Sequence, residues 1–322
     1  MTTATATKPK PTRRGKSTEE IYEAVTNRMI EALEGGTVPW QRPWKLSTAH
    51  ANLKTKKAYR GINPFLLDFT AQTEGYKRSY WLTYKQADAL GGQVRKGEKS
   101  TLVIFWKLLT VDKIVNGQKI KDKNGKPVKT KLPLLNYYNV FNVDQVEGIE
   151  DKIPAEIEEK EFDPIQEAQS IIDEMPNAPK IMHRGDRACY VPSLDCVHLP
   201  DQEQFQSAEY YYHTAYHELV HSTGHEDRLH RVKDWATFGK DPYAKEELVA
   251  EMGASMVSAI AGIDVPVQDN SANYLASWLK RFKEDKKLLV QAASKAQRAS
   301  DFIIGKTYED DKEASNQPKG TA

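Results

Sequence analysis

The chain has 322 residues, of which 39% are hydrophobic and 28% are charged. This length exceeds what one hydrophobic core usually organises, so we expect two domains. No run of about 18 apolar residues occurs, and the Thr-, Lys- and Pro-rich start contains no apolar segment. We therefore expect no membrane span, no secretory signal and no membrane partner, and we expect a cytoplasmic protein.

The net charge of +1 hides two oppositely charged parts. Residues 1–145 contain 26 Lys and Arg against 12 Asp and Glu, a net +14, whereas residues 146–322 contain 20 against 33, a net −13. A basic region of this size favours an anionic polymer as partner, and nucleic acid is the default. We expect a disordered basic arm over residues 1–16 and a nucleic-acid-binding domain over residues 17–145.

This first domain should combine helices with a pair of long strands. Apolar periodicity, capping residues and strand-like runs carry the prediction. The segment 112–131 has two Asn-Gly turns and seven lysines, which is typical of a hairpin, and we expect it to lie over the nucleic-acid surface. The predicted helices cover 18–33, 63–73 and 84–90, and the predicted paired strands cover 101–109 and 132–141.

Aromatic residues alternate with Lys and Arg in the basic domain. The pattern suits single-stranded DNA, because bases stack on rings while cations follow the phosphates. No helix-turn-helix or zinc-finger pattern occurs, which disfavours duplex recognition. Trp81 and Trp106 lie in apolar strand-like runs, so we expect both in the core. The candidate DNA contacts are Trp40, Arg42, Trp44, Arg60, Arg95, Lys96 and Lys99, and for the tryptophans Trp40 and Trp44 a core position is an equal alternative.

The acidic part begins after a charged segment, 146–162, that lacks a core pattern and is predicted to be a linker. The second domain is expected over residues 163–305, and a disordered tail over 306–322. An edge strand beside a metal site can receive an extended peptide in zinc peptidases. The predicted elements are helices over 164–175 and 274–296, and edge strands over 190–192 and 196–200.

The most specific motif is His217-Glu218-Leu219-Val220-His221. It lies in a stretch without Pro or Gly that Ser207 can cap and Gly224 can end. Residues four apart share one face of a helix, so both imidazoles can bind one metal ion. Glu218 can then serve as general base toward a metal-bound water. The motif predicts a Zn²⁺ hydrolase site rather than a surface helix with two solvated histidines.

A catalytic zinc ion needs a third protein ligand and one open position. Asp241 and Pro242 predict the start of a helix that carries Glu247 and Glu251 on one face. We expect Glu247 to be the third ligand, because two crossing helices give better trigonal geometry than one helix and its own tail. Glu251 should accept a hydrogen bond from the other nitrogen of a ligand histidine. The alternatives for the third ligand are Glu246, Glu251, Asp227 and His225.

Several ordered motifs run through both parts of the chain. They are PWQRPW at 39–44, YRGIN at 59–63, GGQVRKGEK at 91–99, YNVFNVDQ at 138–145, HELVHSTGH at 217–225 and YAKEELVAE at 243–251. Through them the chain resembles the ArdC antirestriction proteins of plasmids and other mobile elements, from about Ser17 to Ile304. The resemblance implies an N-terminal domain that binds single-stranded DNA, a C-terminal domain like a zinc metallopeptidase, and protection of incoming DNA from host restriction. Ser222 departs from the pattern, which has an aromatic residue at that place.

We therefore expect an α+β protein with a basic α/β domain and a zincin-like domain of the gluzincin type. The main hypothesis is an antirestriction protein that binds single-stranded DNA and uses Zn²⁺, held by His217, His221 and Glu247, to cleave a DNA-bound protein, with Glu218 as the general base. The alternative is a DNA-coating shield with a structural or vestigial zinc site and no proteolysis. A DNA mimic is disfavoured, since the first domain is strongly basic.

Overall fold

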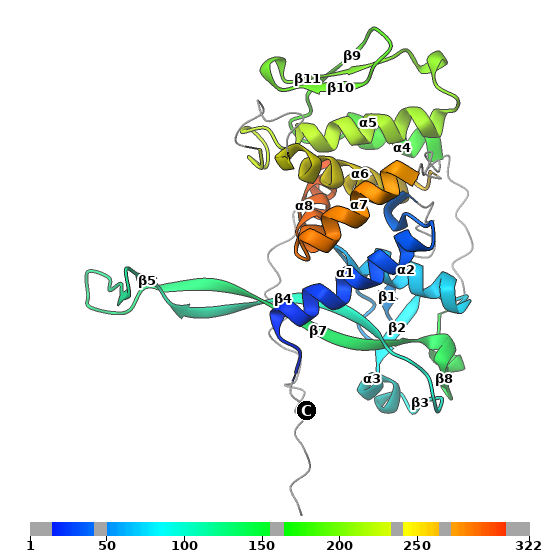
Figure 1. Ribbon diagram of the computed structural model, residues 1–322, viewed down its shortest axis with the longest axis vertical. Helices are drawn as coiled ribbons and strands as arrows, with labels where there is room; N and C mark the ends of the chain where they lie inside the picture. Colours follow the sequence, from blue (N-terminus) through cyan, green and yellow to red (C-terminus); the bar gives the residue numbers. More distant parts are fainter. Residues whose placement is uncertain (1–14, 42–49, 155–163, 233–240, 264–271, 307–322) are drawn as a thin grey trace, which may run out of the picture.

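The computed structural model of the protein describes residues 15–41, 50–154, 164–232, 241–263 and 272–306 (Figure 1). Most of the predicted arm and tail, residues 1–14 and 307–322, lies outside the described residues. Helices and sheets are both present, as expected for an α+β protein. No helix within the described ranges is long and apolar enough to cross a membrane.

The first helix confirms the sequence prediction. Helix α1 spans Thr18–Glu34, and Ser17 caps it in a reciprocal capping box with Glu20. Its apolar residues recur at three- and four-residue spacing, which places them on one buried face. A short 3-10 helix, η1, follows at Pro39–Gln41 and is also buried. The N-terminal segment is therefore anchored by packing on both elements.

A mixed four-stranded sheet lies below these helices in Figure 1. The strands and their flanking helices are β1 (Ala51–Asn52), α2 (Asn63–Glu74), β2 (Tyr80–Thr83), α3 (Tyr84–Ala89), β4 (Thr101–Asp112) and β7 (Lys129–Asn142). The order is β1-β2-β7-β4, with β1 parallel to β2 and the other neighbours antiparallel. The predicted strand pair is β4 and β7, and both strands are longer than predicted.

Strands β4 and β7 pair along their whole length as a two-stranded ribbon, and the outer part of this ribbon projects far from the body of the molecule (Figure 1). At its tip, β5 (Ile114–Val115) pairs with β6 (Gln118–Lys119). Asn116 and Gly117 both have positive φ, as a two-residue hairpin turn requires. The predicted hairpin is thus confirmed as a structure.

The first part of the predicted linker packs into the N-terminal half. Strand β8 (Val146–Glu147) pairs with β3 (Gln93–Val94), and the short helices η3 (Val143–Gln145) and η4 (Glu150–Lys152) flank it. Ile149 is fully buried in a small apolar cluster with the β8 residue Val146. Residues 155–163, the rest of that segment, lie outside the described residues.

The C-terminal half places helices under a small sheet. Its elements are α4 (Pro164–Asp173), β9 (Lys180–His183), β10 (Cys189–Val191), η5 (Pro192–Leu194), β11 (Cys196–Leu199), η6 (Gln202–Gln204), α5 (Ala208–Ser222), α6 (Asp241–Ala261), α7 (Ala272–Glu284) and α8 (Leu288–Ile303). The strand order β10-β11-β9 makes β10 an edge strand, but β11 is central, so the prediction of an edge at 196–200 is wrong.

The predicted helix over 274–296 is also wrong in its continuity, because two helices occupy this region. Helix α7 ends at Glu284, and the Asp285 carboxylate accepts a hydrogen bond from the backbone N–H of Lys287. Such a side-chain turn competes with helical hydrogen bonding, so the chain changes direction before α8 begins.

One large apolar core joins the two halves of the chain. It contains Met29 of α1 and Trp40 of η1 together with Tyr216 of α5, Met252 of α6 and Leu289 of α8. Figure 1 shows α6, α7 and α8 between α5 and the N-terminal helix α1. The N-terminal segment therefore belongs to the packing that supports α6.

Gly253 lets α6 approach α5 closely. A Cβ atom at this position would lie 2.8 Å and 3.0 Å from the two methyl carbons of Val220, which is inside the histidine motif. The glycine therefore sets the separation between the helix with the two histidines and the helix with Glu247.

Gly253→Ala is expected to lower the free energy of unfolding by about 1–3 kcal/mol, because overpacking outweighs the better helix propensity of alanine. It should also weaken metal binding by separating the helices. Urea unfolding and zinc titration measure both effects. The double variant with Val220→Ala should recover much of the loss, and a single variant as stable as the wild type would contradict this contact.

Candidate metal centre

Helix α5 presents its histidines on one face. The Ser207 hydroxyl caps the helix by accepting a hydrogen bond from the Tyr210 N–H, as predicted, and the helix ends at Ser222. His213, His217 and His221 follow each other at four-residue intervals, so their side chains project on the same side, toward α6. The continuous helix thus brings the two motif histidines to one place.

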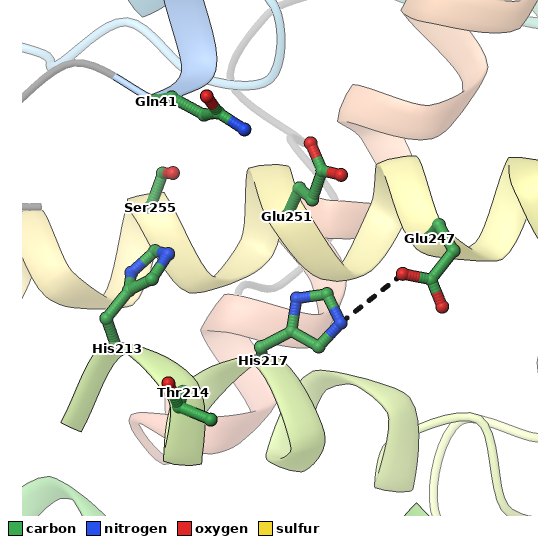
Figure 2. A pocket seen from close by; sticks show the side chains of 7 residues that line it. All are labelled: Gln41, His213, Thr214, His217, Glu247, Glu251 and Ser255. Carbon is green, nitrogen blue, oxygen red and sulfur yellow. Dashed lines mark ion pairs between the residues drawn. The ribbon is translucent and has the colours of Figure 1, made fainter. Parts of the chain in front are cut away.

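The imidazoles meet a carboxylate from α6. The Nε2 atoms of His217 and His221 are 3.1 Å apart, and Glu247 oxygens lie 3.5 Å from the first and 3.3 Å from the second (Figure 2 draws the His217–Glu247 pair). Bonds of about 2.0–2.1 Å at tetrahedral angles around zinc separate ligand atoms by about 3.3–3.4 Å. Glu247 Oε1 is buried without a hydrogen-bond partner among the described residues. The three side chains therefore fit a zinc-like ion.

The other third-ligand candidates are placed differently. Among the described residues, the group of histidine and acidic side chains close enough to share an ion consists of His217, His221 and Glu247. The Asp227 side chain is 69% exposed and pairs with His225 beyond the end of α5. The geometry favours Glu247 over these two alternatives.

The electrostatics of the site favour a positive charge. Burial of His221 would lower its pKa, but the carboxylates of Glu246 and Glu247 outweigh burial and raise the pKa to about 9. Burial likewise acts to raise the pKa of Glu247, yet the two histidines hold it well below its usual range. The same negative potential attracts a metal cation.

Glu246 occupies the place that we predicted for Glu251. One Glu246 oxygen lies 3.6 Å from Nδ1 of His221, which has no hydrogen-bond partner among the described residues. The Nε and Nη2 atoms of Arg231 each donate a hydrogen bond to one oxygen of Glu246, and Nη2 also donates to the Val220 carbonyl. Glu246 is therefore the carboxylate placed to orient a ligand histidine, and its position is fixed by arginine.

Glu251 and Trp40 form a different contact from those expected. The Trp40 indole N–H donates to Glu251 Oε2 at 2.8 Å, and the Tyr274 hydroxyl donates to the same oxygen. Burial raises the pKa of Glu251. Trp40 is fully buried, and its carbonyl accepts a hydrogen bond from Ser255. A base cannot stack on Trp40, so the candidate DNA contact at this residue is wrong, and its alternative, a core position, is confirmed.

Glu218 faces the edge strand. One of its oxygens, Oε2, accepts a hydrogen bond of 2.7 Å from the backbone N–H of Tyr190 in β10, and the residue is 9% exposed. The sheet edge and the predicted general base are therefore adjacent. Tyr190 was not singled out as a site residue, because only tertiary packing brings β10 to α5.

A cavity of about 260 Å³ opens beside the histidine pair. Figure 2 shows its lining from three elements, with Gln41 from η1, His213 from α5 and Ser255 from α6. The remaining lining residues are Thr214, His217, Glu247 and Glu251. Sequence reasoning missed Gln41, His213 and Ser255; the spacing of His213 four residues before His217 was a signal that could have found it.

The other predicted DNA contacts are scattered. Arg60 pairs with Asp301 of α8, and Arg95 pairs with Glu98 of its own loop. Trp81 is buried as predicted, but Trp106 is 39% exposed, so its predicted core position is wrong. Two further candidates, Lys96 and Lys99, are exposed, and the last two, Arg42 and Trp44, lie outside the described residues.

A histidine pair on one helix, a glutamate from a crossing helix and an adjacent sheet edge define a zincin-like centre. In agreement, residues 166–295 match a family model described as a zincin-like metallopeptidase. Residues 19–141 match the N-terminal domain of the anti-restriction factor ArdC.

Known proteins of similar sequence extend this match. Crystal structures of the antirestriction ArdC protein from plasmid R388, one metal-free and one Mn(II)-bound, share 36% identity with the chain at a TM-score of 0.67. They align over 88% of this chain and over 96% and 97% of their own. The chain belongs to the ArdC antirestriction family, as the sequence motifs predict.

Three curated relatives are also similar. Two Escherichia coli proteins named DNA primase TraC are 39% and 38% identical over 88% of this chain, which spans only 27% and 20% of their lengths. The uncharacterized protein y4eC of Sinorhizobium fredii is 35% identical and is covered over 91% of its length.

Proposed function

We propose that this chain is an antirestriction protein that binds single-stranded DNA of an incoming mobile element in the cytoplasm and cleaves DNA-bound proteins at a metal centre. The observation that carries the peptidase assignment is the triangle of His217, His221 and Glu247 atoms beside Glu218. A bound Zn²⁺ would polarise the peptide carbonyl and make an attacking water more acidic. Because one relative was crystallised with Mn(II), both ions are to be tested.

The protein's own residues supply the proton transfer and the substrate alignment. The Tyr190 N–H holds one Glu218 oxygen, and the carboxylate can take a proton from the attacking water and return it to the leaving amine. Strand β10 lies at a sheet edge beside this carboxylate, and an extended peptide can add to such an edge. These contacts support a peptide as the substrate.

Removal of the metal tests the peptidase proposal. The chain treated with a chelator is expected to lose cleavage of a DNA-binding protein bound to single-stranded DNA, and to regain it with Zn²⁺ or Mn²⁺. Its affinity for the DNA itself should not change, because the ligands are remote from the ribbon. Gel analysis of the substrate and a DNA titration provide the two measurements. Cleavage that continues without metal would rule out this centre as its source.

The β4–β7 ribbon is the surface that we propose for single-stranded DNA. Phe105 and Tyr138 stack with ring centres 4.5 Å apart on one face, and Tyr138 is 41% exposed. Alternation along β4 places Lys107 on this same face, where it is exposed. A base can stack on the open Tyr138 ring while the ammonium group contacts a phosphate.

Tyr138→Ala is expected to weaken binding of single-stranded DNA by roughly 5- to 150-fold, since stacking contributes about 1–3 kcal/mol per base. Fluorescence anisotropy with a labelled oligonucleotide at one fixed salt concentration measures the change. Tyr84→Ala removes an exposed tyrosine outside the ribbon and should bind as the wild type does. Equal losses in the two variants would argue against the ribbon.

A further inference from the structure

The cavity beside the histidine pair has an unusual lining. The residues that line it, among those described, are all polar, and two of them are carboxylates, but none is Lys or Arg. Its volume of about 260 Å³ is below the roughly 300–1,000 Å³ of sites for drug-sized ligands. It is therefore suited to one polar side chain of a larger molecule.

Hydrogen-bond acceptors in this lining lack partners. Gln41 is 7% exposed, and its Oε1 atom is buried with no hydrogen-bond partner among the described residues, while its Nε2 donates to Tyr274. Trp40 and Tyr274 both donate to Oε2 of Glu251, so the other oxygen of this half-buried carboxyl group, Oε1, can accept a hydrogen bond from a ligand. An unpaired buried acceptor is unfavourable, so a ligand that donates hydrogen bonds would be stabilised here.

The single imidazole at the far end of the cavity does not oppose a cation. His213 Nδ1 lies 3.0 Å from the Ser258 hydroxyl, and Figure 2 shows its ring rising from α5 toward Ser255. Burial, with a smaller contribution from His217, lowers the pKa of His213 to about 3, so this imidazole is neutral at physiological pH. An anionic group, by contrast, would meet the carboxylates of Glu247 and Glu251.

We propose that the cavity binds a lysine or arginine side chain of a peptide held at the metal centre. This assignment rests on the proposed peptidase function and adds the substrate class to it. The cavity reaches His217 and Glu247, so a side chain in it belongs to a residue next to the peptide bond at the metal. Proteins that bind DNA carry many Lys and Arg residues to contact phosphates, and they would present such side chains.

The test uses dipeptide hydroxamates, whose metal-binding group anchors them without any reaction. Three probes differ only in the adjacent side chain, which is lysine, norleucine or glutamate. Calorimetry with the zinc-loaded full chain should give at least tenfold tighter binding for the lysine probe than for norleucine, and the weakest binding for glutamate. Norleucine binding as tightly as lysine would overturn the proposal.

Matched variants locate the preference. Glu251→Gln should reduce the lysine-to-norleucine ratio to less than about threefold, while Glu174→Gln, the same change at an exposed site just after α4, should leave the ratio intact. If Glu251→Gln does not fold or retain zinc, Gln41→Leu serves instead and should also reduce the ratio. A ratio unchanged in a folded, zinc-loaded cavity variant refutes the assignment.

The outcomes distinguish failure of the cavity proposal from failure of the peptidase proposal. Probe binding needs the metal but not Glu218. If all three probes bind equally and peptide cleavage is intact, the proposed preference for a basic side chain is wrong and the peptidase proposal stands. If the lysine probe is preferred but no peptide is cleaved, the cavity proposal stands and the peptidase proposal is wrong. If no probe binds to the zinc-loaded chain, both proposals are wrong.

Discussion

Glu218→Gln is expected to abolish peptide cleavage while the metal stays bound. The amide oxygen of glutamine can still accept the hydrogen bond from Tyr190, so the local structure should persist. Glutamine cannot take a proton from water, however, and a positioned general base contributes typically 10²–10⁴-fold to a rate. Cleavage should therefore fall by about that factor at unchanged zinc content. Metal analysis and a peptide-cleavage assay on the same preparation measure both quantities.

The same variant decides between the peptidase and the DNA-coating shield. If protection from restriction in cells requires cleavage, Glu218→Gln should lose protection. If the zinc site is structural or vestigial, the variant should protect as well as the wild type does. Glu226→Gln, an identical change at an exposed residue beyond α5, is the control and should retain both activities. Undiminished cleavage by Glu218→Gln would show that Glu218 is not the base.

Trp40→Ala is expected to lower the free energy of unfolding by about 3–5 kcal/mol, the usual loss for removing a buried tryptophan. The Trp40 ring is fully buried and packs edge-on against Trp278 and Phe282 of α7. Its removal also deprives the half-buried Glu251 of a hydrogen-bond donor. Because Trp40 holds η1 against α6, the variant should bind zinc more weakly as well.

Urea unfolding and zinc titration measure these two effects. Trp40→Phe retains most of the ring but lacks the N–H group, so it separates the loss of packing from the loss of the hydrogen bond to Glu251. Trp106→Ala, at an exposed tryptophan of the ribbon, should lower the free energy of unfolding by less than Trp40→Ala does. A Trp40→Ala protein as stable as the wild type would show that the N-terminal segment does not support the metal centre.

Local signals made much of the fold predictable. Ser207 caps α5 as expected, and Ser17 caps α1 in the same way, because a capping hydroxyl acts on a backbone N–H only a few residues away. The Asn116-Gly117 turn likewise determines its own backbone conformation. The Asp285 turn between α7 and α8 was equally local, but the apolar periodicity across it concealed the break.

Burial could not be predicted for individual aromatic residues. Trp40 and Trp106 both have prolines, lysines or apolar residues as neighbours in the sequence. Trp40 is nevertheless fully buried, whereas Trp106 is exposed. Composition does not reveal which strand projects as a ribbon and which segment packs on α6. That choice depends on contacts between residues more than 200 positions apart, such as Trp40 with Glu251.

The sequence by itself determined the pair of histidines, since four-residue spacing on a helix places His217 and His221 on one face whatever surrounds them. It also determined the charge division and the family motifs. Only the tertiary structure decided the partners of that pair. The packing of α6 on α5 at Gly253 places Glu247 beside both imidazoles and Glu246 beside the other nitrogen of His221. Glu251 instead accepts a hydrogen bond from Trp40 of η1. These carboxylates lie within a stretch of six residues on one helix, and only neighbouring elements distinguish their roles.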